Sequence, residues 1–303
     1  MKIKLIPRIL VSLINLNYNY IKCGYERFLF RQSKAKLGHH SYFPNAEDVL
    51  KNPYIFVLST GRCGTGLITD ILSKSPRLRV EHNPKPELEY VSSIVHRDNI
   101  SEEAQKIAIL AARFDLFFLD TFLRGKIYVE TNNRISFFAP ALADLLPNAK
   151  FIHLVRDPAD FVRSGMRRRY YQDGVVQHQR LDGSNYSPWN TFSRLEKVAW
   201  EWNEINKKIE NFKAIVDPGR VLMINSEALY KDPAMTFEIF DFIEFDNPFI
   251  GRKGLQSLEK LLSTPVNKQK EGYFPKYAQW DESDKNAFQN IVTLAAKYGY
   301  IYE

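Results

Sequence analysis

The feature that most constrains this fold is an apolar run followed by a glycine-rich turn and an amphipathic segment, together residues 54–72. The run Tyr-Ile-Phe-Val-Leu at 54–58 is bounded by turn residues and predicts a buried strand of a parallel sheet. In the turn, we expect Gly61, Gly64 and Gly66 to adopt positive φ and to let backbone N–H groups approach a ligand. A helix that begins at this turn presents unpaired N–H groups and the positive end of its dipole. The segment therefore predicts an anion site, above all for phosphate.

The same turn differs from the phosphate loop of nucleoside triphosphatases. That loop reads Gly-x-x-x-x-Gly-Lys-[Ser/Thr], and its lysine reaches the terminal phosphates. Here Gly61 and Gly66 have the required spacing, but Leu67 stands where the lysine is needed and the strong base is Arg62, inside the turn. We therefore expect a phosphate-binding turn for a reaction other than ATP or GTP hydrolysis.

A second apolar run, residues 150–155, predicts another buried strand that leads directly into a helix. Asp157 is typical of an N-cap, Pro158 of the first helical position, and Asp160 adds an acidic side chain in the first turn. In both segments, a predicted strand is thus followed by the N-terminus of a predicted helix.

Three side chains around this second junction are suited to bind an anion. Arg156 follows the strand directly, and Ser164 and Arg168 lie four residues apart on one face of the predicted helix. A guanidinium and a hydroxyl at the carboxyl end of a strand can both donate hydrogen bonds to a phosphate. We therefore expect a second anion site here.

The first segment resembles a motif of the sulfotransferases that use 3′-phosphoadenosine 5′-phosphosulfate (PAPS). In that family, Arg-x-Gly-Thr after the first strand holds the 5′-phosphosulfate. The cofactor-binding residues that this resemblance implies are Arg62, Cys63, Gly64, Thr65 and Gly66.

The second segment resembles the 3′-phosphate signature of the same family, Arg-[Asn/Asp]-Pro-x-Asp-x-x-x-Ser, which matches residues 156–164. The resemblance implies that Arg156 and Ser164 bind the 3′-phosphate. It extends from about residue 54 to the C-terminus, although only these two motifs are specific. Either motif alone is weak evidence, whereas both in order, each after a predicted strand, indicate a P-loop-kinase-like sulfotransferase fold.

Strand and helix signals alternate along the rest of the chain. The strands we expect are 54–59, 78–81, 126–130, 150–155 and 220–225. The helices we expect are 65–73, 101–123, 136–146, one beginning at 158, 191–212 and 233–242. This alternation predicts an α/β domain with a central parallel sheet flanked by helices. Ligands of such sheets bind beyond the carboxyl ends of the strands, where both anion motifs fall.

The loop after the second expected strand, residues 81–88, contains the candidate general bases. In related sulfotransferases a His or Glu in this region acts on the acceptor hydroxyl, and many bacterial members read His-Glu-Pro. Here His82 matches the His, but Asn83 replaces the Glu and cannot take a proton. We therefore expect His82 to be the base, because its ordinary pKa suits the task, with Glu81 and Glu87 as alternatives. A histidine that only hydrogen-bonds within this proline-fixed turn is the competing interpretation.

The resemblance further implies in-line sulfuryl transfer without a metal. Arg62, the N–H groups of the turn and the Thr65 hydroxyl would stabilise the charge on the leaving phosphate. Members of the family close a flexible, basic C-terminal loop over the cofactor, and Lys268 or Lys270 are the candidates for that role here.

Histidine and cysteine usage points away from a metalloenzyme and from a disulfide-stabilised protein. The six histidines are scattered, and their one adjacent pair, residues 39–40, lies in a polar stretch. Cys23 and Cys63 give no disulfide framework, and a cysteine inside the phosphate turn fits a reducing compartment. We therefore expect no metal and a cytoplasmic protein.

The net charge of +7 belongs to an N-terminal arm. Residues 1–40 carry eight Lys or Arg and one acidic residue, which leaves 34 basic and 34 acidic residues in the remainder. The body is therefore neutral, and nucleic-acid binding is not predicted. The apolar stretch 9–21 is too short and polar to span a bilayer, which takes about 20 apolar residues, and no signal cleavage site follows it.

We expect residues 1–45 to form a basic arm and residues 46–303 the sulfotransferase domain. A basic, amphipathic arm can lie on the inner face of an anionic membrane, and the alternative is a solvated helix that caps the domain.

Three functions compete at this stage. The first is PAPS-dependent transfer to a hydroxyl acceptor, on a glycan or glycolipid. The second is a P-loop-type nucleotide kinase, which the missing Gly-Lys-[Ser/Thr] disfavours. The third is a non-catalytic, phosphate-binding or membrane-associated scaffold.

Overall fold

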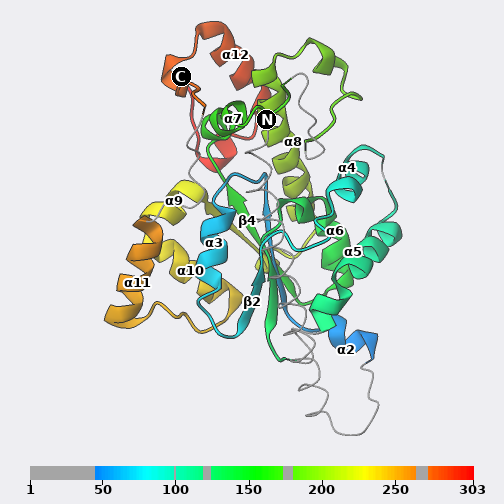
Figure 1. The fold of residues 1–303 in the computed structure, drawn as a ribbon. Helices are drawn as coiled ribbons and strands as arrows, with labels where there is room; N and C mark the ends of the chain where they lie inside the picture. The colour runs from blue at the N-terminus through cyan, green and yellow to red at the C-terminus, as the bar shows by residue number, and fades with distance from the viewer. Residues whose placement is uncertain (1–44, 99, 119–123, 173–179, 264–271) are drawn as a thin grey trace, which may run out of the picture.

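The protein has an α/β fold with one parallel sheet between two layers of helices, as seen in a computed structural model (Figure 1). The structure describes residues 45–98, 100–118, 124–172, 180–263 and 272–303. Its five strands are β1 (Tyr54–Ser59), β2 (Leu78–Glu81), β3 (Ile127–Glu130), β4 (Ala149–Val155) and β5 (Val221–Asn225). Their order across the sheet is β2-β3-β1-β4-β5, and every neighbouring pair is parallel.

β1 is the central strand, and all six of its residues are buried. Tyr54 pairs with Tyr128 of β3 on one side and with Ala149 of β4 on the other. A strand covered on both faces needs a continuous apolar run, which is what residues 54–58 provide. The chain leaves β1 for the edge strand β2, returns to β3 and then crosses to β4, so the sheet changes winding direction around β1. Ligands of open α/β sheets bind at such a point.

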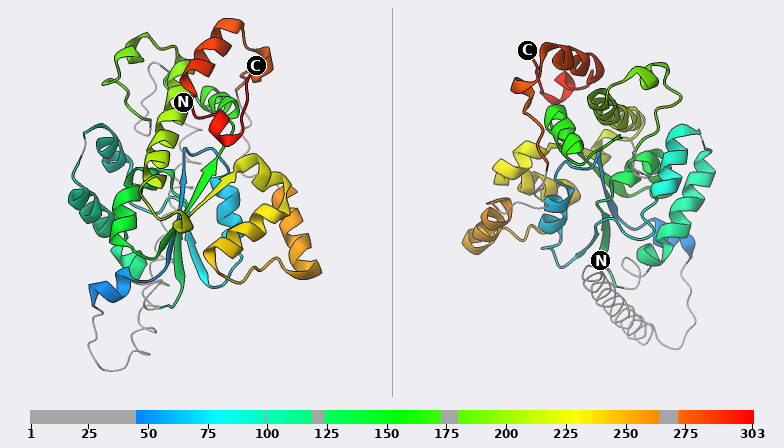
Figure 2. Two further views of the ribbon diagram at one scale, coloured as in Figure 1. Left: turned by 180° about the vertical axis from the view of Figure 1, so that it is seen from behind. Right: turned by 45° about the horizontal axis from the view of Figure 1, so that its top comes forward.

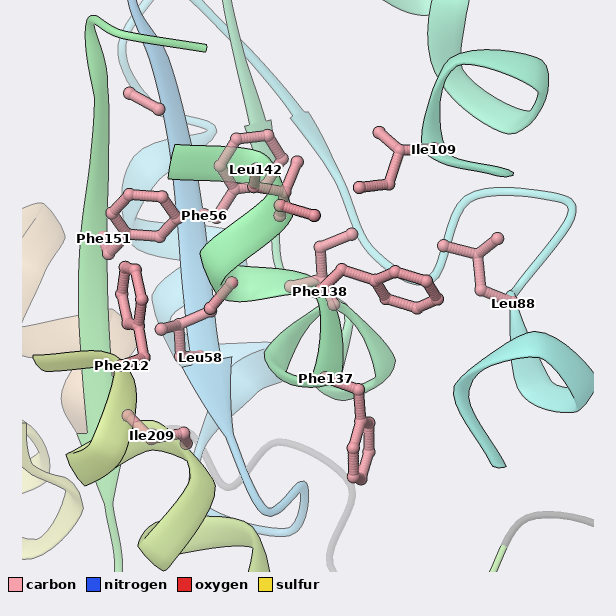
Figure 3. Close-up of a cluster of buried hydrophobic side chains, with 14 of the residues drawn as sticks. Phe56, Leu58, Leu88, Ile109, Phe137, Phe138, Leu142, Phe151, Ile209 and Phe212 are labelled. Atoms are coloured by element: carbon pink, nitrogen blue, oxygen red, sulfur yellow. The ribbon is translucent and has the colours of Figure 1, made fainter. Parts of the chain in front are cut away.

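One face of the sheet is covered by helices from the first half of the chain and by the C-terminal part of the longest helix that the structure describes (Figures 1 and 2). These elements are α2 (Ala46–Leu50), α4 (Glu89–Arg97), α5 (Glu102–Leu116), the 3₁₀ helix η2 (Asn133–Phe138), α6 (Ala139–Leu145) and α8 (Arg194–Lys213). Their apolar side chains meet those of the sheet in one cluster (Figure 3). Within it, Phe151 of β4 stacks on Phe56 of β1 and meets Phe212 of α8 edge-on.

The opposite face is covered by the helix after β1 and by three helices that follow β5 (Figure 1). These are α3 (Thr65–Leu72), α9 (Ser226–Lys231), α10 (Pro233–Ile243) and α11 (Gly251–Ser263). Ile55 and Val57, which alternate with the residues on the first face, pack in this cluster.

A third apolar cluster lies beyond the carboxyl end of β4 (Figure 1). It joins α8 to four further elements, α7 (Pro158–Arg167), η5 (Tyr277–Gln279), α12 (Glu282–Ile291) and η6 (Ala296–Tyr298). Trp202 of α8 is fully buried there, and its Nε1 donates to the backbone carbonyl of Arg156 at 3.0 Å. Helix α8 thus supports Arg156, the residue that follows β4.

Most of the expected elements are confirmed, with small shifts at their ends. The expected helix at 136–146 is a 3₁₀ turn from Asn133 followed by α6, and the expected helix 191–212 begins at Arg194, after the 3₁₀ helix η3 (Ser187–Thr191). The sequence analysis did not anticipate α4, α9, α11 or α12. The arm at 1–44 lies outside the described residues. Within the described part of the chain, no helix is long and apolar enough to cross a membrane.

Candidate active site

The turn between β1 and α3 has three residues with left-handed backbone. Gly61 and Gly64 have φ of +74° and +88°, as expected, and Arg62 between them has φ of +57°. The expectation for Gly66 is wrong, because this residue is already part of α3. Left-handed backbone costs an L-residue about 1–2 kcal/mol. The backbone strain of the turn is therefore at Arg62, the residue that the sequence predicts to bind the phosphosulfate.

Side chains from other elements anchor this turn. The amide of Ser59 donates to Ser136 Oγ at 2.9 Å, and the amide of Gly61 donates to Ser59 Oγ at 3.2 Å. On its other side, a Cβ on Gly64 would lie 3.2 Å from the Tyr230 ring. Only glycine combines this close approach with positive φ, so the turn is packed between η2 and α9.

The two predicted anion motifs meet. Arg156, which follows β4, donates from Nη1 to the backbone carbonyl of Arg62 at 2.6 Å. Arg62 in turn donates from Nε to Ser164 Oγ at 3.5 Å. These side chains line one cavity of about 600 Å³, together with Gly64, Thr65 and Gly66. Two motifs about ninety residues apart in sequence therefore form a single site.

The helix that carries Ser164 begins as expected. Asp157 is the N-cap of α7, and its Oδ1 accepts from the amide of Asp160 at 2.8 Å. Pro158 occupies the first position. This start sets the face of α7 on which Ser164 and Arg168 both line the cavity.

The cavity concentrates positive charge. Burial lowers the pKa of Arg62, and the nearby guanidinium groups of Arg168 and Arg156 lower it further, because like charges disfavour the protonated form. Arg156 has a distant acidic partner, Asp160, at 3.7 Å. The Nε of Arg168 is buried and has no hydrogen-bond partner among the described residues. Such a site is suited to a polyanion that neutralises the three arginines.

Cys63 faces away from this cavity. Its side chain is fully buried in the apolar cluster around α3, and burial raises the pKa of its thiol. Cys63 therefore does not line the cavity, although its neighbours Arg62 and Gly64 do.

His82 lines the same cavity from the loop after β2. Its Nδ1 lies 2.8 Å from Oγ1 of Thr131, the residue that follows β3. The amide of Thr131 donates to the carbonyl of Glu81 at 3.0 Å, which extends the pairing of β2 and β3 by one residue. Burial lowers the pKa of His82, while hydrogen bonding to Thr131 and the charges of Asp70 and Glu87 act against this shift. The imidazole is therefore held neutral at pH 7.

The two alternative bases are engaged elsewhere. Glu81 accepts a hydrogen bond from Arg79 Nε at 2.8 Å, and Glu87 forms an ion pair with Lys85. Among the described residues of this loop, His82 and Asn83 line the cavity, whereas Glu81 and Glu87 do not.

A buried ion pair holds the far end of the His82 loop. Arg113 of α5 and Glu130 of β3 are fully buried and form two hydrogen bonds, of 2.8 and 2.9 Å. Arg113 also donates from Nη1 to the Pro86 carbonyl at 2.8 Å, and Asn132 donates from Nδ2 to the Glu87 carbonyl at 3.1 Å. The loop is therefore tied to the end of β3 along its length.

Several residues of the site escaped the sequence analysis. They include Thr131 and Asn133, which follow β3, and Ser226 and Tyr230 of α9, which begins directly after β5. A signal was present for both groups, since polar residues follow an apolar strand in each case. Lys268 and Lys270 lie outside the described residues. Within the described ranges, no group of three or more His, Cys, Asp or Glu could hold a metal ion.

Comparisons with known proteins match this chain to sulfotransferases. The model of the sulfotransferase family matches residues 53–246, which include both motifs. An omega-hydroxy-beta-dihydromenaquinone-9 sulfotransferase of Mycobacterium bovis, Stf3, is 29% identical over 114 residues, or 37% of this chain. That match covers 27% of the length of the relative, and the same holds for its Mycobacterium tuberculosis counterpart.

A solved sulfotransferase structure shares the fold of this chain at low sequence identity. A sulfotransferase from Alicyclobacillus acidocaldarius has a TM-score of 0.50 and 14% identity, and the alignment covers 83% of this chain and 97% of that one. The sulfotransferase domain of the Synechococcus PCC 7002 olefin synthase aligns with 84% of this chain and 96% of its own, with a TM-score of 0.48 and 16% identity.

Proposed function

This chain belongs to the sulfotransferase family, and on that premise we propose that it transfers a sulfuryl group from PAPS to a hydroxyl of a glycan or glycolipid. The observation that carries the proposal is the hydrogen bond from Arg156 to the Arg62 carbonyl. It brings the arginine that follows β4 against the turn that follows β1, and a nucleotide with phosphates on both the 5′ and 3′ positions would need cationic groups at both of these sites.

The residues of the cavity fit such a nucleotide. Three mutually repelling guanidinium groups and an unpaired, buried Nε of Arg168 call for a ligand with several negative charges. We propose that Arg62, Thr65 and the backbone of residues 64–66 bind the 5′-phosphosulfate. The 3′-phosphate would be bound by Arg156, Ser164 and Arg168. A closing role for Lys268 stays a prediction from the sequence.

The chemistry then divides among residues of this chain. When bound, PAPS supplies the sulfuryl group: a bond forms between sulfur and the acceptor oxygen, and the bond from sulfur to the phosphate oxygen breaks with its electron pair left on the phosphate. Arg62 and the N–H groups at the start of α3 stabilise that charge. His82, neutral and in the same cavity, takes the proton of the acceptor hydroxyl.

A second cavity supports an acceptor that carries a lipid. It has a volume of about 650 Å³ and lies between the His82 loop, α4 and α5, with Leu88, Val91, Ala108, Ala111 and Ala112 among its lining residues. Apolar walls beside the loop of the proposed base suit a hydrocarbon chain whose hydroxyl reaches His82. The menaquinone-derived acceptor for which Stf3 is named agrees with a lipid-bearing substrate. We therefore favour a glycolipid over a free glycan.

The test is transfer of ³⁵S from labelled PAPS to a glycolipid and to the oligosaccharide released from it. We expect labelled glycolipid with the wild type, less label on the oligosaccharide, and no product with Arg62→Ala. A protein that binds the nucleotide yet labels no hydroxyl compound would instead be a phosphate-binding scaffold. An Arg62→Ala variant with wild-type turnover would contradict the site assignment.

A further inference from the structure

Two threonine hydroxyls connect His82 to the phosphate turn. Nδ1 of His82 lies 2.8 Å from Thr131 Oγ1, which lies 2.7 Å from Thr69 Oγ1. Thr69 Oγ1 then donates to the carbonyl of Thr65, the first residue of α3, at 2.6 Å. The three side chains come from the loop after β2, the end of β3 and the helix after β1, which is where this strand order brings those segments together.

The hydrogens of this chain can be placed from its acceptors. A threonine hydroxyl has one hydrogen, and a carbonyl oxygen can only accept, so the Thr69 hydrogen lies toward Thr65. The Thr131 hydroxyl has two possible acceptors, Thr69 Oγ1 at 2.7 Å and the Glu81 carbonyl at 3.5 Å. It must donate to Thr69, because two oxygens 2.7 Å apart need one hydrogen between them and the longer contact is at the limit of a hydrogen bond. With its hydrogen used, Thr131 can only accept from His82, and Nδ1 of His82 therefore carries the proton.

The other ring nitrogen agrees with this assignment. Nε2 of His82 lies 3.4 Å from Nδ2 of Asn83, a group that only donates. A neutral imidazole has one proton, so with Nδ1 protonated Nε2 has a lone pair that can accept from Asn83. The partner of one ring nitrogen generally decides the state of the other.

We propose that Thr131, held by Thr69, is a positioning residue that fixes His82 in the Nδ1–H tautomer, so that Nε2 takes the proton of the acceptor hydroxyl. This inference rests on the proposed role of His82 as the base. The resulting imidazolium keeps its Nδ1–H bond to Thr131, and the proton that it gains on Nε2 comes from the acceptor.

The chain also sets the position of the base relative to the phosphate turn. Thr131 is fixed through its backbone, because its amide donates to Glu81, the residue before His82. Thr69 is fixed one helical turn after Thr65. Helix α3 thus orients the imidazole and also carries the proposed 5′-phosphosulfate site. The base and the sulfuryl donor are therefore both positioned by α3.

The two threonines make opposite predictions when each is changed to valine. In Thr69→Val the hydrogen of Thr131 is released and can turn toward Nδ1, so the proton of His82 moves to Nε2. In Thr131→Val Nδ1 loses its 2.8 Å partner and keeps only the 3.4 Å contact with Thr69 Oγ1, whose hydrogen points to Thr65, so both tautomers become populated. Thr131→Ser keeps the hydroxyl, and we expect it to retain the Nδ1–H tautomer and at least half of the wild-type kcat.

The experiment is ¹⁵N NMR of the full chain labelled at histidine, with the His82 signals identified by their loss in His82→Gln. Nitrogen shifts distinguish protonated from unprotonated ring nitrogens directly and do not depend on activity. We expect protonated Nδ1 and unprotonated Nε2 in the wild type at pH 8, the reverse in Thr69→Val, and a mixture in Thr131→Val. Protonated Nε2 in the wild type, or a tautomer unaffected by both valine variants, overturns the inference.

Kinetics on the same variants distinguish positioning from general destabilisation. We expect kcat to fall at least tenfold in both valine variants, with KM for PAPS within twofold of the wild type. Thr293→Val, which changes an exposed threonine beside Asn203, is the matched control and should leave kcat unchanged. If His82→Gln keeps full activity while the wild type shows the Nδ1–H tautomer, the proposed base is wrong and the threonine chain is structural only. An unchanged kcat in Thr69→Val despite the reversed tautomer also rejects the positioning role.

Discussion

Arg156 donates a hydrogen bond from Nη1 to the backbone carbonyl of Arg62, 94 positions earlier in the chain, at 2.6 Å. The carbonyl belongs to a residue with φ of +57°, so this bond stabilises the left-handed conformation that gives the phosphate turn its shape. Arg156 therefore has two roles in our account, since its charge attracts the 3′-phosphate and its hydrogen bond supports the 5′ side of the site.

Arg156→Ala should weaken binding of 3′-phosphoadenosine 5′-phosphate about 10- to 100-fold. Loss of a hydrogen bond to a charged group costs about 1.5–3 kcal/mol, and each 1.4 kcal/mol is about tenfold in Kd. Isothermal titration calorimetry measures the change. Arg252→Ala removes an arginine of α11 outside the cavity and should bind like the wild type. Equal affinity of Arg156→Ala and wild type would remove Arg156 from the site.

Gly64→Ala should lower both stability and nucleotide affinity. Alanine at φ of +88° costs about 1–2 kcal/mol in unfolding free energy, and its Cβ would also press on Tyr230 at 3.2 Å. Gly299→Ala is a matched control, because its φ is +83° and nothing lies within 4 Å of the added Cβ. Urea denaturation should show a similar loss in both variants, whereas calorimetry should show weaker nucleotide binding in Gly64→Ala alone. Unimpaired nucleotide binding by Gly64→Ala would mean that the turn does not contact the phosphates.

The sequence predicts the strands of this fold well and several of its helices poorly, for one physical reason. β1 is buried on both faces, so its apolar run is unmistakable. By contrast, α4, α11 and α12 each bury one residue fully, namely Ser92, Leu258 and Phe288. Each of these helices does have an apolar face, but the face is short and mostly only partly buried, so its pattern is easily overlooked beside the fully buried strands.

The site divides in the same way. Local motifs identify Arg62 and Arg156, because a turn and a helix start have sequence signatures. Thr131 has only the weak signal of a polar residue after an apolar strand, and its contact with His82 depends on β3 lying between β1 and β2. The partnership of Arg113 and Glu130 likewise depends on tertiary packing of α5 against the end of β3. Contacts between residues on neighbouring strands can be predicted only once the order of the strands in the sheet is known.

The pH dependence of kcat/KM should reflect the neutral form of His82. Since burial lowers its pKa, His82 stays unprotonated as the pH falls past the ordinary histidine value of about 6.5. We therefore expect kcat/KM to be constant from neutral to mildly acidic pH and to decline only below about pH 6.5, the ordinary pKa of histidine. In His82→Gln the residual kcat/KM should no longer decline at acidic pH, because the titrating imidazole is absent. A decline that begins above pH 7 in the wild type would contradict the assignment.

The Arg113–Glu130 pair should contribute strongly to stability. Arg113→Met leaves the buried carboxylate of Glu130 without its partner, and we expect a loss of about 3–5 kcal/mol in unfolding free energy. The double variant Arg113→Met with Glu130→Leu should recover part of that loss, because neither charge is then buried unpaired. As a surface control, Lys51→Met breaks an exposed ion pair with Glu47 and should cost about 1 kcal/mol or less. Denaturation in guanidinium chloride compares the four proteins. Equal stability of Arg113→Met and Lys51→Met would contradict this account.

Acidification should destabilise the fold through buried histidines. Burial lowers the pKa of His153 to about 4, against an effect of the opposite sign from Asn206. Between that value and the ordinary 6.5 the unfolded chain binds the proton and the folded one does not, so stability falls as the pH drops, by at most about 3 kcal/mol for this residue. Thermal unfolding from pH 7 to 4 should show a shallower decline in His153→Gln. His96, whose pKa is also lowered to about 4, accounts for part of the remainder. The same slope in His153→Gln and wild type would exclude His153 as a source.

The most direct test of the central claim is the melting temperature with 3′-phosphoadenosine 5′-phosphate compared with AMP, ADP and ATP. A ligand that binds only the folded state stabilises it by about 2.7 kcal/mol at a hundredfold excess over Kd. We expect a clear rise with the bisphosphate and little or none with the other three, and Arg156→Ala should reduce that rise. An equal or larger rise with ATP, or no response to the bisphosphate, would contradict the joining of the two anion motifs into one PAPS site.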